Sequence, residues 1–185
     1  MSSPRQPTDL VAPVGAPTRW TSRPLPVYRH VPGLTPHPIN HPDGHSYGTP
    51  AAADDPLDLD IERHWRRCEP YLYGVDLFNR AYFWEAHEAW EEVWHAVGHR
   101  TLSGRMVQGM IQVAAALLQR HRGMERGAER NFAKARAHFE AVAENKKPGV
   151  GPIYLGVDLP SWITAVTEFL TNDAAPFPFL YLGED

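Results

Sequence analysis

The chain has 185 residues, of which 43% are hydrophobic and 11% aromatic, so it is long enough to bury the core of one domain. Its formal net charge is −4, and its basic residues are scattered among acidic ones instead of forming a basic patch, which argues against nucleic acid as the main partner. The single cysteine, Cys68, excludes an internal disulfide framework and fits a reducing compartment.

The N-terminus lacks the basic-then-apolar pattern of a secretory signal. The most apolar run, residues 113–118, is far too short to cross a bilayer. We therefore expect a cytoplasmic protein with no membrane partner.

Residues 1–56 form an arm that holds twelve of the eighteen prolines. Because proline fixes φ and removes a backbone donor, the arm cannot be a helix or a central strand. We expect the first twenty residues to be disordered. The part from about residue 24 to 48 is expected to pack along the helical body, because it carries several apolar side chains: Leu25, Tyr28, Val31, Leu34 and Tyr47.

Histidines recur every four residues in this arm, at His37, His41 and His45. A helix would align them, but Pro38 and Pro42 prevent a helix there. The paired Cys/His spacing of a structural zinc site is absent, so polar loop histidines are favoured over metal ligands.

Residues 57–185 have helical periodicity and are expected to form a single domain. We predict an all-α fold: a compact bundle of about five to six helices with an extended Pro/His-rich N-terminal arm. No strand is predicted, and the tail over residues 175–182 is expected to lie extended over the body. The predicted helices run from Ile61 to Cys68, Tyr71 to Phe78, Tyr82 to His99, Arg105 to His121, Met124 to Glu144, and Asp158 to about Leu170. Asp58 or Asp60 is expected to cap the first helix and Ser103 the fourth, while Pro70 precedes the second.

Acidic and aromatic side chains interleave along the Tyr82–His99 helix, whereas a surface helix would separate them. Some of its carboxylates are therefore expected to be half-buried, which indicates a polar site. His87 and Glu91 lie four residues apart and can ligate one metal ion, with Glu88 as a candidate catalytic base. This pattern matches half of the His-Glu-x-x-His zinc signature, and a third ligand is missing from the local sequence.

A structural role is the alternative for the same residues. His87 would then be neutral and bonded to a carboxylate or to Gln112, which would tie two helices together. Gln108 lies four residues from Gln112 and would also bond between helices, while Trp94 would belong to the core or line a pocket beside the polar strip.

Residues 78–94 and 108–116 resemble an uncharacterised bacterial and archaeal helical family known as domain of unknown function 309. The shared pattern is a Phe-Asn turn, a helix reading Glu-x-His-Glu-x-x-Glu-x-x-Trp, a Gln-Gly-x-x-Gln helix and a Gly-Ala-rich helix, over about residues 71–144. Short members begin near Pro70, and residues 24–48 are similar to a leader in longer members. The resemblance implies a compact all-α bundle and no established activity, and it supports one shared polar site: Glu85, His87, Glu88, Glu91, Trp94 and Gln112.

Two functions remain open from the sequence. The preferred one is a non-enzymatic scaffold that binds another protein or self-associates, with a Glu/His/Gln polar core site. The alternative is a metal-assisted hydrolase that uses a divalent ion held by His87 and Glu91, with Glu88 as base.

Overall fold

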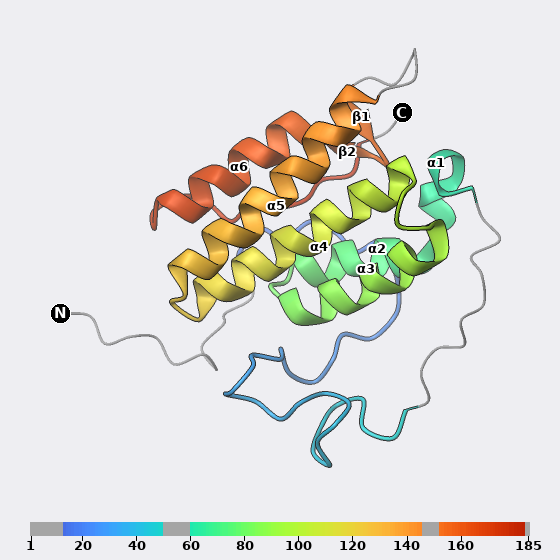
Figure 1. The fold of residues 1–185 in the computed structure, drawn as a ribbon. Helices are drawn as coiled ribbons and strands as arrows, with labels where there is room; N and C mark the ends of the chain where they lie inside the picture. The colour runs from blue at the N-terminus through green and yellow to red at the C-terminus, as the bar shows by residue number, and fades with distance from the viewer. Residues whose placement is uncertain (1–12, 50–59, 146–151, 184–185) are drawn as a thin grey trace.

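The computed structural model describes residues 13–49, 60–145 and 152–183. In those ranges nearly all of the regular secondary structure is helical, and the helices form a compact bundle with the extended arm alongside (Figure 1). This confirms the predicted fold class. The elements are α1 (Ile61–His64), a 3-10 turn (Trp65–Arg67), α2 (Glu69–Phe78), α3 (Phe83–Val97), α4 (Leu102–His121), α5 (Glu125–Glu144), β1 (Ile153–Tyr154), β2 (Val157–Asp158) and α6 (Leu159–Thr171).

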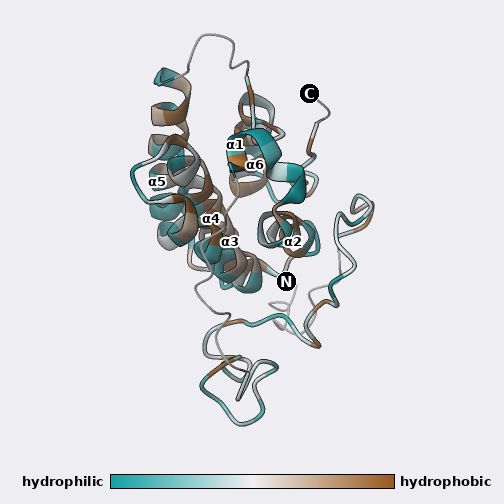
Figure 2. Ribbon diagram, turned by 90° about the vertical axis from the view of Figure 1, so that its right-hand side faces the viewer, coloured by the Kyte–Doolittle hydropathy of each residue, from teal (hydrophilic) through white to brown (hydrophobic). Residues whose placement is uncertain are grey.

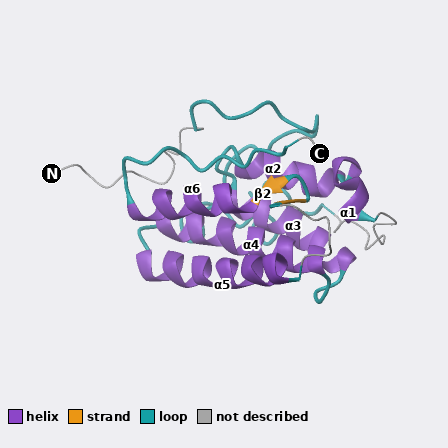
Figure 3. Cartoon of the chain, turned by 90° about the horizontal axis from the view of Figure 1, so that it is seen from above, coloured by secondary structure: helices purple, strands orange, loops and turns teal. Residues whose placement is uncertain are grey.

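Helices α2 to α5 pack in chain order, because each is joined to the next by a short turn. The axes of α4, α5 and α6 run side by side in the view from above (Figure 3). Hydrophobic residues gather where the helices face one another (Figure 2). The predicted inward stripe of α5 is buried throughout: Ala128, Phe132, Ala135, Phe139 and Val142.

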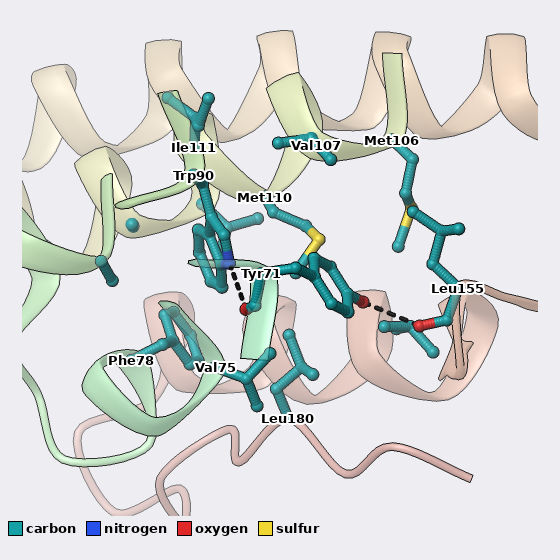
Figure 4. Packing of buried hydrophobic residues seen from close by; sticks show 14 of the residues in the cluster. Tyr71, Val75, Phe78, Trp90, Met106, Val107, Met110, Ile111, Leu155 and Leu180 are labelled. Atoms are coloured by element: carbon teal, nitrogen blue, oxygen red, sulfur yellow. Dashed lines mark hydrogen bonds between the residues drawn. The ribbon is translucent and has the colours of Figure 1, made fainter. Parts of the chain in front are cut away.

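Two glycines allow close helix contacts. A side chain at Gly74 in α2 would collide with the indole of Trp90 in α3, and one at Gly109 in α4 would collide with the ring of Phe139 in α5. Trp90 is fully buried and donates its indole N–H to the Tyr71 carbonyl (3.1 Å), while the Tyr71 hydroxyl donates to the Leu155 carbonyl (2.8 Å; Figure 4). The inner face of α3 is thus fixed by packing and by one buried hydrogen bond.

The observed helix starts differ from three expectations. Thr101 caps α4 by accepting the Gly104 N–H (2.9 Å), so the predicted Ser103 cap is wrong; Ser103 already lies inside the helix. The segment from Ile61 to Cys68 is split into α1 and the 3-10 turn. Asp60 takes the N-cap position of α1 without a side-chain hydrogen bond, and Asp58 lies outside the described residues.

The short β1–β2 hairpin was also not predicted. Both residues of its turn have positive φ, at Leu155 (50°) and Gly156 (79°), as two-residue hairpin turns require. Two-residue strands are too short to produce an alternating pattern, which explains why no strand was predicted here.

Asp158 caps α6 as predicted, through the Ser161 N–H (3.2 Å). The C-terminal tail lies extended on the body, as expected. The Asn79 side chain binds both the N–H and the carbonyl of the buried Leu180 (2.8 and 2.9 Å). No helix among the described residues is long and apolar enough to span a bilayer.

The arm runs along α2 and α3. Buried Asp76 in α2 accepts hydrogen bonds from the backbone N–H groups of Trp20 and Thr21 (2.8 and 2.9 Å). The Tyr73 hydroxyl donates to the arm carbonyl of Pro24 (2.8 Å), and the Tyr82 hydroxyl donates to that of Pro26 (3.1 Å). Polar groups on the helices therefore hold a segment that has no secondary structure of its own.

Candidate functional site on helix α3

The three metal-site candidates lie together on α3. One ligand atom from each of His87, Glu88 and Glu91 lies within 4.8 Å of the other two, and all three residues are half-buried. The imidazole Nε2 of His87 is 3.2 Å from Glu91 Oε1, with the two side chains 29% and 39% exposed. Glu91 lies four residues after His87 and three after Glu88, so the local geometry of α3 makes both of them neighbours of Glu91.

Glu88 is the perturbed acid of this group. Its pKa is raised to about 7, first by burial and then by the charges of Glu91 and Glu85. A carboxyl with a pKa near neutrality can both accept and release a proton at physiological pH. It would also be stabilised in its charged form by a nearby cation.

Glu85, one turn earlier, is in a different environment. It is only 5% exposed because the arm covers it. Its Oε1 accepts the backbone N–H of His30 (2.7 Å) and lies 3.2 Å from His45 Nε2. Its Oε2 is buried and has no hydrogen-bond partner among the described residues.

The arm histidines do not join the metal candidates. His45 contacts Glu85, His37 packs its ring against Trp84 (5.5 Å), and His41 is exposed beside Asp43. Within the described residues, the His87 group is the one cluster with three metal-ligating side chains. Within the described residues, therefore, no arm histidine supplies a third ligand beside His87 and Glu91.

The other predicted site residues are not among these three candidate ligands. Trp94 stacks on His99 (3.8 Å between ring centroids), and its buried indole N–H has no hydrogen-bond partner among the described residues. Gln108 and Gln112 are half-buried on α4. Of the two partners considered for His87, a carboxylate or Gln112, the contact observed is with the carboxylate of Glu91.

The sequence reasoning missed two features of this region. Glu92 shares a face of α3 with Glu85 and Glu88, and burial raises its pKa. Asp76 was not predicted to anchor the arm. The sequence does carry a sign of it, because a carboxylate within the apolar run of α2 is expected to be buried only if it is paired.

The fold and the site define a class: an all-α bundle whose third helix carries a carboxylate-rich, partly exposed face. Residues 71–131 match the sequence model of the family described as Domain of unknown function (DUF309), which confirms the resemblance predicted above. The match runs from α2 into the first part of α5 and so contains the whole of α3 and α4. The chain gave no match among curated proteins.

Proposed function

We propose that the protein binds a divalent cation through His87 and Glu91, with Glu88 beside them as the base, and that its reaction class is metal-assisted hydrolysis in the cytoplasm. One observation carries this proposal: three donor atoms of suitable types gather within 4.8 Å at a partly exposed position. Solvent access matters because a catalytic ion must keep a coordination position for water, whereas a closed structural site does not.

Each residue has a distinct role in this proposal. His87 and Glu91, which are already 3.2 Å apart, are the ligands. A bound cation would supply Lewis acidity and lower the pKa of a bound water. Glu88 would accept the proton from that water, a role that suits its pKa of about 7.

The test is calorimetric titration of untagged, metal-free protein with Zn²⁺ and, separately, Mn²⁺. We expect about one ion per chain and a loss of affinity of at least about tenfold in His87→Ala, because a ligand is removed. His64→Ala is the matched control, since His64 is an exposed histidine of α1. Equal affinity in the wild type and His87→Ala, or no binding in either, would overturn the proposal.

The second candidate is the non-enzymatic scaffold, which the environment of Glu85 favours. A buried carboxylate that accepts a hydrogen bond from the arm backbone holds the arm on the helix and is not placed to react with a substrate. In that case the partner is another protein or a second copy of the chain. Sedimentation at increasing concentration tests self-association, and a monomer throughout would remove that form of the proposal.

A further inference from the structure

A second site lies between α3 and the arm. It is a pocket of about 270 Å³ whose lining includes the carboxylates of Glu85, Glu88 and Glu92 and the aromatic rings of Trp84 and Tyr73. We propose that this pocket binds a small organic cation, a primary amine on a short alkyl chain. The two sites share Glu88, but this proposal does not depend on metal binding, because His87 and Glu91 do not line the pocket and the carboxylate oxygen without a donor belongs to Glu85.

The charge of the pocket favours a cationic ligand. Its three carboxylates lie on one face of α3 and pass from buried Glu85 through half-buried Glu88 to exposed Glu92. The basic residues in the lining are Arg23 and His45. The Arg23 guanidinium stacks over the Tyr73 ring (4.3 Å), with Nη1 3.7 Å from Glu69 outside the pocket. The lining thus holds three carboxyl groups against two basic side chains, and a bound cation would favour the charged form of Glu88, whose pKa is about 7.

Glu85 gives independent support, because one of its two carboxylate oxygens, Oε2, lacks a hydrogen-bond donor among the described residues. The side chain is 5% exposed, His30 and His45 both contact Oε1, and Oε2 has no partner among the described residues. A buried carboxylate oxygen without a donor is costly, and most such groups in folded proteins are paired. A primary ammonium group brings three donors and a positive charge.

The remaining lining suits a short alkyl chain. Leu77, Ala89 and Ile39 contribute apolar surface, and the Trp84 ring can contact a cation through its face. Ligand pockets of this kind combine an apolar lining with a few polar groups that fix orientation. A molecule with one charged end and a few methylene groups matches both parts of the pocket.

The experiment is calorimetric titration of the full chain, free of divalent metal, with n-butylamine and with n-butanol. The two probes have similar size and shape and differ in charge. We expect butylamine to bind with a Kd of about 1 mM, a reasonable value for a ligand of so few atoms, and butanol to bind at least about tenfold more weakly. Raised salt should weaken the amine only, because part of the pocket is exposed.

Variants locate the site. Glu85→Gln keeps an oxygen for the His30 N–H but loses the charge, so amine affinity should fall by at least about tenfold. Glu88→Gln serves as a second variant that does not touch the arm anchor. Glu140→Gln, on the exposed surface of α5, is the matched control, and His87→Ala should bind the amine like the wild type. Equal binding of butylamine and butanol, no binding of butylamine at about 10 mM, or an unchanged affinity in both Glu85→Gln and Glu88→Gln would overturn the proposal.

Discussion

Two neighbouring turns of α3 carry the same chemistry in opposite environments. Glu85 is covered by the arm and bonded to it, whereas His87 and Glu91 pair at a surface that solvent reaches. Residue type does not explain the difference, since both turns are rich in carboxylates. The difference lies in what covers each turn: the covered carboxylate can hold the arm, and the open group can receive a ligand.

The largest expected effect concerns the inner face of α3, on which both turns depend. Trp90→Ala should lower the free energy of unfolding by about 3–5 kcal/mol, because it leaves a large cavity and removes a buried hydrogen bond. Denaturant unfolding measures this loss. If the variant stays within about 1 kcal/mol of the wild type, the core of α3 is not what positions the two turns.

The next effect tests the covering arm. Asp76→Ala removes the acceptor of two arm backbone N–H groups and of the Thr21 hydroxyl, and should cost about 2–3 kcal/mol. The freed arm should also be cut faster by trypsin at the Arg19–Trp20 bond. Asp43→Ala, at an exposed arm position, is the control and should leave both readouts unchanged.

A direct contrast of the two turns should give a smaller but more specific result. Glu85→Ala should cost about 1–3 kcal/mol, because it leaves the buried His30 N–H without its acceptor. Glu91→Ala removes one partner of a partly exposed pair and should change the free energy of unfolding by less than about 1 kcal/mol. Equal costs would contradict the distinction between a covered and an open turn.

The smallest expected effect is a pH dependence at Glu88. Its pKa is about 7 in the folded protein against an ordinary value of 4.5, so the folded state keeps a proton that the unfolded state releases as pH rises. Stability should therefore fall as pH rises from about 4.5 to about 7 and level off above that. After allowance for solvent screening, Glu88→Gln should be about 1 kcal/mol more stable than the wild type at pH 8.

Denaturant unfolding at pH 5 and pH 8 measures this difference. At pH 5 the two proteins should be nearly equally stable, because Glu88 is protonated in the folded state. An equal gain at both pH values would point to packing instead of ionisation.

Local sequence determined the helices and the His87 cluster. Helical periodicity identified the long elements, and the spacing makes both His87 and Glu88 neighbours of Glu91 on the surface of an α-helix. The stripe of α5 and the Asp158 cap were predictable for the same reason, since they depend on residues a few positions apart.

Only the tertiary structure decided which carboxylates are covered. The contact of Glu85 with His30 joins residues 55 positions apart, and the contacts of Asp76 with Trp20 and Thr21 join residues 56 and 55 positions apart. Such contacts depend on how an irregular, proline-rich arm crosses α2 and α3, and no periodicity encodes that path. The sequence therefore determined the chemistry available on α3, while the packing of the arm decided its burial, because burial depends on distant parts of the chain.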